Sequence, residues 1–342
     1  MKKILFIALL GLAAVSCQKT VDAVKTGTEL GFKAGMVETR STLETLDVMK
    51  TSGFSVVGVL TENSEKSNVF YTRPQTVNFN TGSGKWEYSP RRFWHEEGLY
   101  EFTAYAGNVA STINTNDKSS IISTDYQIDA TQDDLVMAYK QDDMANRNAE
   151  HPYVNLNFKH ACAAVCLMVV QNGFTENPYL TDIKVNGIVK GGSLRFGDGN
   201  TPAQKESFRW TVAAPNTTTD FYAWSDATGF EVTTTAVPVF NDTRTYTNGS
   251  ATSFTSDANG SAIALPQDLT DAASVTFTFV NNGIEVTTTK KLLVPDVVTK
   301  WESGKRYIYT LSLEPAKVTV TVRTVEWDEV DGTFNKDLNL QG

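Results

Sequence analysis

Cysteine and histidine side chains are the first candidates for chemistry in this 342-residue chain, because both ligate metals and cysteines also form disulfides. Cys162, Cys166 and His160 lie close together in one segment. On a helix they could contribute to a metal site, although the sequence suggests no fourth ligand. On a strand, four residue steps separate the two cysteine Cα atoms by about 13 Å, whereas a disulfide requires less than about 7 Å. Because the segment is typical of extended structure, we expect two buried free thiols.

The remaining polar residues form no recognisable catalytic arrangement. Besides His160, the histidines are His95 and His151, and the chain contains no Gly-x-Ser-x-Gly motif, metalloprotease helix or phosphate-binding loop. Paired acids occur at 96–97, 133–134 and 142–143. Such pairs usually lie in solvated turns, although two carboxylates brought together by a fold would suit glycoside hydrolysis. We expect no enzymatic activity, no metal and no cofactor, with a hydrolase on a β-sandwich scaffold as the remote alternative.

Cys17 carries the strongest chemical signal. It follows a short basic start, an apolar run over residues 4–14 and several small residues, which is the layout of a secretory signal peptide. The apolar run is too short to span a bilayer, which requires roughly 20 residues. Its ending on cysteine resembles a bacterial lipoprotein leader, in which the thiol is acylated and becomes the new N-terminus. We predict a signal peptide over residues 1–16 and lipidation of Cys17, for example with palmitate.

An ordinary secretion signal is the alternative to a lipoprotein leader. Ala14 and Ser16 are both small, as the cleavage site of a soluble secreted protein requires. Lipoprotein leaders also favour leucine three residues before the cysteine, where this chain has Ala14. Both alternatives predict export.

The composition argues against nucleic acid as a partner and favours strands. The chain has 30 Lys and Arg against 39 Asp and Glu, a formal charge of −9, and removing the leader with its two lysines makes this about −11. An acidic chain without a basic cluster offers few contacts to phosphates. Thr, Asn, Ser, Gly and aromatic residues are plentiful, a mixture typical of strands and turns.

Apolar and polar residues alternate over short runs along most of the chain, which is the signal of half-buried strands. In the cysteine segment, the even-numbered positions from 154 to 170 lie on one predicted face, and all but His160 are apolar. Turn dipeptides occur at 172–173, 186–187, 198–199 and 282–283. No segment shows a long helical stripe. We therefore predict an all-β fold built of β-sandwiches.

A polar stretch over residues 140–151 separates an aromatic-rich first part from the cysteine segment. The chain is long enough for two domains. We place their boundary near residue 150, with 171–178 as the alternative, so that the first domain covers 41–150 and the second 151–342.

The alternation changes phase near the C-terminus. Val318, Val320 and Val322 are even-numbered and would lie on one face of a strand, whereas Val325 and Trp327 are odd-numbered and would lie on the other. A one-residue slip turns every following side chain to the opposite face. We therefore expect either a β-bulge near 323–324 or a new strand that begins there.

Several segments together resemble the fimbrillin-like proteins of Bacteroidales, the subunits and accessory proteins of type V pili. Each segment is mostly a strand pattern, but their order and spacing are fairly specific, and the resemblance covers nearly the whole mature chain. The segments are 29–32, 39–41, 54–58, 85–90, 93–94, 99–105, 134–138, 154–161 and 301–309. The resemblance implies two tandem β-sandwich domains of the transthyretin-like or Greek-key type, export as a lipoprotein, and a cell-surface or outer-membrane location.

The resemblance also implies assembly by strand exchange. In such pilins an arginine-specific protease removes the N-terminal segment with its first strand, and a neighbouring subunit fills the exposed groove with a strand of its own. Here the first strand is predicted at 30–37, and Arg40, followed by Ser41, is the best cleavage candidate. Residues 17–40 would then leave with the lipid. An uncleaved chain, in which Cys17 is a permanent tether, is the equal alternative, and Arg73 is a poorer candidate because proline follows it.

The predicted donor strand lies in the C-terminal segment 318–340. Its apolar residues are Val318, Val320, Val322, Val325 and Trp327. The implied partners are other pilin subunits and the outer membrane, through the lipid, with a host or bacterial surface glycan or protein as a further candidate.

The predicted function is that of a fimbrial subunit or pilus-associated adhesin. The main alternative is a surface lipoprotein that does not polymerise and binds glycans on aromatic side chains. The candidate aromatics are Trp86, Trp94, Trp210 and Trp224. This alternative requires that these tryptophan side chains be exposed to solvent, whereas aromatic residues in strands more often belong to the core.

Overall fold

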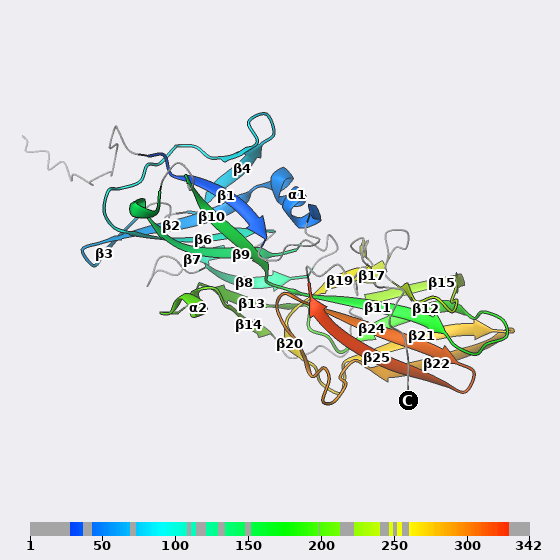
Figure 1. Ribbon diagram of the computed structural model, residues 1–342. Coiled ribbons are helices and arrows are strands. Elements are labelled where there is room, and N and C mark those ends of the chain that lie inside the picture. The colour runs from blue at the N-terminus through cyan, green and yellow to red at the C-terminus, as the bar shows by residue number, and fades with distance from the viewer. Residues whose placement is uncertain are drawn as a thin grey trace, which may run out of the picture.

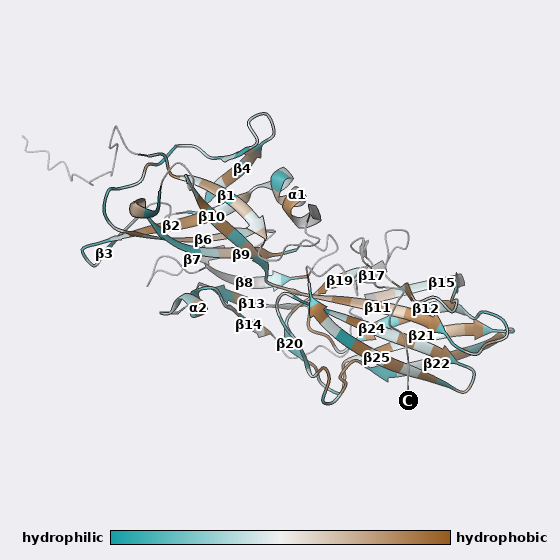
Figure 2. Ribbon diagram, in the orientation of Figure 1, coloured by the Kyte–Doolittle hydropathy of each residue, from teal (hydrophilic) through white to brown (hydrophobic). Residues whose placement is uncertain are grey.

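The computed structural model describes residues 28–36, 43–68, 73–107, 111–113, 121–128, 134–147, 152–197, 199–212, 222–239, 246–248, 252–254 and 260–327. Strands dominate these residues and gather into two groups of sheets along an elongated molecule (Figure 1). Hydrophobic residues concentrate on the strands, and hydrophilic ones on many of the connecting turns (Figure 2). The predicted all-β class is confirmed. Within the described residues, no helix is long and apolar enough to cross a membrane.

The first sheet has the order β1-β10-β9-β6-β2-β4-β5, with β3 paired to β2. One of its faces, together with the helix after β1, buries an aromatic core that includes Phe32, Phe102 and Phe158. The sheet curls over this core, since its end strands β1 and β5 contact each other, and we call the curled sheet with its core the first sandwich. The strands are β1 (Gly31–Met36), β2 (Phe54–Glu62), β3 (Glu65–Asn68), β4 (Gln75–Asn80), β5 (Lys85–Glu87), β6 (Leu99–Ala106), β9 (Val136–Asp143) and β10 (Tyr153–His160).

A four-stranded sheet, in the order β14-β13-β8-β7, joins the two halves of the chain. Its strands are β7 (Ser111–Ile113), β8 (Ile121–Gln127), β13 (Gly191–Phe196) and β14 (Phe208–Val212). Leu194 of β13 belongs to the same buried cluster as Val57 and Met137 of the first sheet. Between β13 and β14, Lys205 of the short helix α2 (Pro202–Lys205) lies 3.4 Å from Glu101 of β6.

The second sandwich packs a five-stranded sheet, β16-β11-β24-β25 with β19 on β11, against a six-stranded sheet, β18-β17-β15-β12-β21-β22. The five-stranded sheet contains β11 (Ala163–Gln171), β16 (Val237–Pro238), β19 (Ser261–Ala264), β24 (Lys305–Glu314) and β25 (Lys317–Glu326). The six-stranded sheet contains β12 (Tyr179–Asn186), β15 (Tyr222–Glu231), β17 (Tyr246–Asn248), β18 (Thr252–Phe254), β21 (Ser274–Asn281) and β22 (Ile284–Lys291). A short pair, β20 (Gln267–Asp268) and β23 (Lys300–Trp301), completes the described strands.

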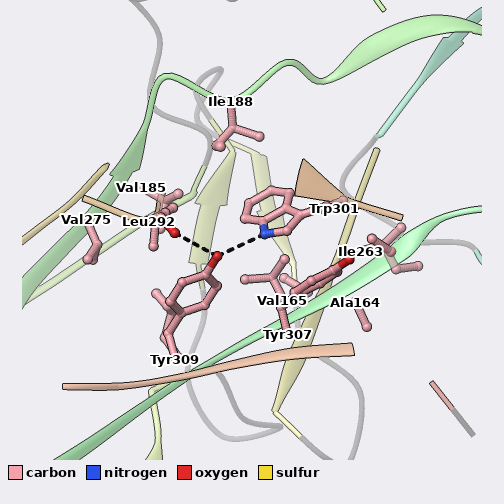
Figure 3. Close-up of a cluster of buried hydrophobic side chains, with 14 of the residues drawn as sticks. Ala164, Val165, Val185, Ile188, Ile263, Val275, Leu292, Trp301, Tyr307 and Tyr309 are labelled. Atoms are coloured by element: carbon pink, nitrogen blue, oxygen red, sulfur yellow. Dashed lines mark hydrogen bonds between the residues drawn. The ribbon is translucent and has the colours of Figure 1, made fainter. Parts of the chain in front are cut away.

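Buried hydrogen bonds fix the aromatic centre of the second sandwich (Figure 3). Trp301 Nε1 donates to the Tyr309 hydroxyl at 3.1 Å, and that hydroxyl donates to the Leu292 carbonyl at 3.0 Å. Burial raises the pKa of Tyr309 well above its usual value. Every polar atom of this chain of contacts is therefore paired inside an apolar core, as buried polar groups require.

Strand pairing crosses the boundary predicted near residue 150. β10 follows that boundary, yet it pairs with β1 and β9 of the first sheet. β13 lies later still, yet it pairs with β8 from the first half of the chain. The change from the first sheet to the second sandwich falls at Ala161–Cys162, between β10 and β11.

The single apolar face predicted from 154 to 170 is wrong beyond β10, because the chain bends at 161–162 and changes phase. In β10 the even-numbered Val154, Leu156 and Phe158 enter the first core. In β11 the odd-numbered positions enter the second core, whereas Cys166 and Met168 form a separate cluster on the opposite face. β11 is buried on both faces, so the alternation of odd and even positions could not show which face enters the core.

The bulge or new strand expected near 323–324 is also absent from β25. Its register with β24 runs unbroken from Lys317 to Glu326. The valines of both parities are apolar because both faces are partly covered: Val320 and Val322 pack on the main second core, and Val325 packs on the Cys166 cluster.

The helix α1 (Leu43–Ser52) was not predicted. Its last residue is followed by Gly53, which has a φ of +78° and donates its N–H to the Met49 carbonyl at 2.7 Å, as a glycine after a helix commonly does. Met49 is buried and Leu46 only partly so. Such a narrow contact leaves no long apolar stripe for sequence analysis to detect.

Candidate strand-exchange site

β1 is an edge strand whose side chains complete the first core. It runs parallel to β10 over six residue pairs, from Gly31 opposite Tyr153 to Met36 opposite Phe158. β1 covers residues 31–36 of the strand predicted at 30–37, and residue 37 lies outside the described residues. The ladder between β10 and β9 covers two residue pairs against six with β1, so β1 supplies most of the pairing of β10.

The apolar side chains of this segment are deeply buried. Leu30, Phe32 and Ala34 are 0%, 2% and 8% exposed. The Phe32 ring contacts Phe54, Tyr88 and Phe102 at centroid separations of 6.4, 5.6 and 5.4 Å. Removing β1 would therefore expose these three aromatic rings beside β10, which would lose this pairing partner.

The start of β1 is held by backbone and side-chain contacts to one loop. Leu30 N donates to the Arg92 carbonyl at 2.9 Å, and Trp94 N donates to the Thr28 carbonyl at 3.0 Å. The Tyr88 hydroxyl donates to the Leu30 carbonyl at 2.6 Å, and burial raises the pKa of Tyr88. An exposed ion pair of 2.9 Å between Glu29 and Arg91 adds little stability.

A groove of about 670 Å³ lies along the outer side of β1. The β4–β5 hairpin and α1 form its far wall, where Trp86 and Phe79 pack with a ring separation of 5.2 Å. Lys33, Lys50 and Lys85 also line the groove. Near its other end, the ring of Tyr153 packs over Gly31, where a Cβ would lie only 2.7 Å from the ring.

The predicted lipidation and cleavage residues lie outside the described residues. This applies to Cys17, to Arg40 and to Ser41. In the sequence, Arg40 falls between the end of β1 and the start of α1. A cut there would separate β1 covalently from the rest of the sandwich.

The four predicted donor valines belong to β25, which is paired with β24 and forms the last strand of its sheet, and Trp327 follows directly after this strand. Val318 and Trp327 are 9% and 8% exposed. Trp327 stacks on His160 at a ring separation of 4.3 Å, and His160 Nδ1 lies 2.5 Å from a carboxylate oxygen of Asp134. Residues 328–340 of the predicted donor segment lie outside the described residues.

The four candidate tryptophans do not form a binding platform. Trp94 and Trp224 are buried. Trp210 donates its Nε1 hydrogen to the Ala161 carbonyl at 2.8 Å and packs against Tyr126. Trp86 lines a groove beside β1.

The described cysteine and histidine side chains form no metal-binding or disulfide-bonded group. Cys162 and Cys166 are free and buried, as predicted, and burial raises the pKa of Cys162. His95 Nδ1 lies 3.2 Å from Glu62 at the surface. Among the described residues, which omit His151, no three potential ligands are grouped to hold a metal ion.

A fimbrillin-like family model matches residues 39–327, which is most of the chain. The protein belongs to the fimbrillin-like family. Membership identifies this fimbrillin-like protein as a pilus subunit or pilus-associated adhesin of the cell surface, and it suggests a role without enzymatic chemistry.

A solved structure supports the fold of this fimbrillin-like protein. A fimbrial protein from Bacteroides vulgatus ATCC 8482 is 16% identical, with a TM-score of 0.52 over 87% of this chain and 99% of that one. A fimbrial assembly protein from Parabacteroides distasonis ATCC 8503 is 12% identical, with a TM-score of 0.38 over 88% of this chain and 99% of that one. No protein of curated function matches the chain.

Proposed function

We propose that the protein is a type V pilus subunit that reaches the outer membrane as a Cys17 lipoprotein and polymerises after cleavage at Arg40. The observation that supports this most directly is the placement of β1. It is an edge strand, its inward side chains are buried, and in the sequence it lies between the lipidation site and the cleavage site.

Cleavage at Arg40 would convert a closed sandwich into an acceptor. Without β1, most of β10 would lose its ladder partner, and Phe54, Tyr88 and Phe102 would lose the Phe32 ring that covers them. An unpaired strand beside an apolar groove favours the addition of a new strand. Backbone hydrogen bonds would hold the donor, and its alternate side chains would fill the space that Phe32 leaves.

The donor in this proposal comes from residues 318–340 of a neighbouring subunit. Among the described strands β25 pairs only with β24, so its withdrawal would break one such ladder rather than two. The groove would then be filled by a strand that alternates apolar and polar residues, as Val318, Val320 and Val322 do.

Replacing Arg40 with lysine tests the proposal while retaining the positive charge. An arginine-specific protease should leave Arg40→Lys uncut, and the matched control Arg73→Lys should mature normally. We expect wild-type polymer sheared from cells to begin at Ser41 and to carry no lipid. The Arg40→Lys protein should keep lipidated Cys17 and form no ladder of polymers in unboiled gels. Polymer that begins at Cys17 would contradict cleavage at Arg40, and unchanged palmitate labelling of Cys17→Ala would contradict lipidation.

A further inference from the structure

The outer edge of the second sandwich offers another strand for pairing. Among the described residues, β22 pairs only with β21, and it ends the six-stranded sheet. Its Ile284 and Val286 side chains are 67% and 39% exposed. They face a groove of about 620 Å³ that Phe174 and Val318 also line. A long, exposed edge with apolar side chains is a template for a further strand.

The turn before β22 determines which backbone groups face this edge. Asn282 and Gly283 have φ values of +52° and +75°, which fit a two-residue type I′ turn. In such a hairpin Asn281 and Ile284 form a hydrogen-bonded pair, and these pairs recur at every second residue. The N–H and C=O groups of the odd-numbered residues of β22 therefore point to the free edge.

The charges on the odd-numbered residues of β22 are self-complementary. The strand carries Glu285 at its start and Lys291 at its end, and both residues belong to the odd-numbered set. We propose that β22 pairs antiparallel with β22 of a second copy of this chain, about a two-fold axis at Thr288. This register places Glu285 opposite Lys291 of the other copy, twice, and Thr287 opposite Thr289. Parallel pairing in register would instead place like charges together, which is unfavourable.

A row of threonines supports the same register. On the outer face of β21 and β22, the hydroxyl oxygens of Thr276 and Thr289 lie 2.8 Å apart, and those of Thr278 and Thr287 lie 2.9 Å apart. With Thr287 opposite Thr289 of the second copy, these rows continue across the interface. Threonine pairs on neighbouring strands are favourable cross-strand contacts.

Few existing contacts oppose this pairing. Lys291 Nζ lies 2.5 Å from an Asp271 oxygen, but the two side chains are 58% and 82% exposed, so exchanging that ion pair for one with Glu285 changes little. On the groove face, Val286 would lie opposite the aliphatic part of Lys290 of the second copy.

The contact would be weak for isolated copies. One edge of eight residues buries less than the roughly 1,200 Å² of a stable standard interface. Copies that are already arrayed on one membrane or filament would pair more strongly, because their effective concentration is high. The pairing uses no residue of β1 and does not depend on strand exchange.

A cysteine scan of β22 in the full-length chain reads the register directly. A residue on the two-fold axis lies opposite the same residue of the second copy. Thr288→Cys should therefore give a disulfide-linked dimer under mild oxidation. The neighbouring variants Thr287→Cys and Thr289→Cys should give little dimer alone but should cross-link to each other when mixed. Peptide mass spectrometry should find position 288 linked to itself. Equal cross-linking of all three variants would show random collision and overturn the proposed register.

Charge reversal tests the interface without introducing thiols. Glu285→Lys and Lys291→Glu should each weaken dimerisation of the full-length protein in detergent roughly tenfold, because each places like charges opposite each other twice. The double variant should restore it. A mixture of the two single variants should also associate. Loss without restoration in the double variant, or no loss in either single variant, would overturn the pairing. In strand-exchange assays all of these variants should still form ladders, which separates this proposal from the function proposed above.

Discussion

Truncating Phe32 to alanine tests whether β1 is a detachable element of the first sandwich. The ring is 2% exposed and contacts three other aromatic rings. Removing a buried phenylalanine ring costs about 3–5 kcal/mol when the surrounding structure must stay folded. If β1 docks and undocks as a unit, this loss falls on the docking equilibrium, since the remaining strands can stay folded without it. A loss of 3 kcal/mol corresponds to roughly a 150-fold weaker docking constant.

Phe158→Ala is the matched control. Phe158 is fully buried in the same core and lies 5.4 Å from the Phe54 ring, but it belongs to β10, between β1 and β9. In urea titrations of the uncleaved chain, we expect Phe158→Ala to lower the free energy of unfolding by about 3–5 kcal/mol. Phe32→Ala should lower it less. Instead it should speed amide exchange in β10 and proteolysis between β1 and α1.

Comparing the two variants shows whether β1 detaches on its own or unfolds only with the rest of the first sandwich. Equal losses of unfolding free energy in both variants, with unchanged amide exchange in β10, would show that β1 unfolds only with the whole sandwich. That result would refute the reasoning that makes β1 a removable strand, even if Arg40 were cut in cells.

Two further predictions concern β1 and the tyrosine cores. Gly31→Ala should destabilise β1 by about 1–3 kcal/mol, because its Cβ would lie 2.7 Å from the Tyr153 ring. Limited proteolysis should show this as faster cleavage near β1. Gly35→Ala is the control, since its Cβ would approach only Asn157, at 3.8 Å. Burial raises the pKa of Tyr307 to about 12, above the unfolded value of about 10, so its contribution to stability is complete below about pH 10 and is lost as the pH rises toward 12. Urea midpoints should therefore fall in that range and fall less for Tyr307→Phe, and an identical fall in both proteins would contradict this assignment.

Sequence analysis succeeded where strands are covered on one face. In β21 the alternation of Val275, Phe277 and Phe279 with Thr276 and Thr278 matches the buried and half-buried positions of the structure. The Asn282–Gly283 turn was predicted correctly for a related reason, since positive φ at both residues demands that dipeptide. Local chemistry determines both features.

It failed where pairing partners are distant in the sequence or where both faces are buried. Nothing local shows that Gly31–Met36 lies parallel to Tyr153–His160, or that β13 returns to β8. β11 and β25 carry apolar residues on both faces, so odd and even positions do not distinguish the core side from the solvent side. This is why the apolar face predicted for β11 and the bulge or new strand predicted near 323–324 were wrong. The lipidation and cleavage candidates depend on motifs, so the sequence indicated them without any knowledge of the fold.

The two proposed contacts differ in symmetry, and symmetry determines what each can build. Strand exchange into the β1 groove joins different surfaces of successive subunits, so it propagates without limit into a filament. Pairing of β22 with itself joins identical surfaces about a two-fold axis, so it closes after two copies. Subunits that use both contacts would therefore join filaments side by side, and abolishing the second contact should separate the filaments without shortening them. Charge-reversed Glu285→Lys subunits should then polymerise to normal length as single filaments in electron micrographs.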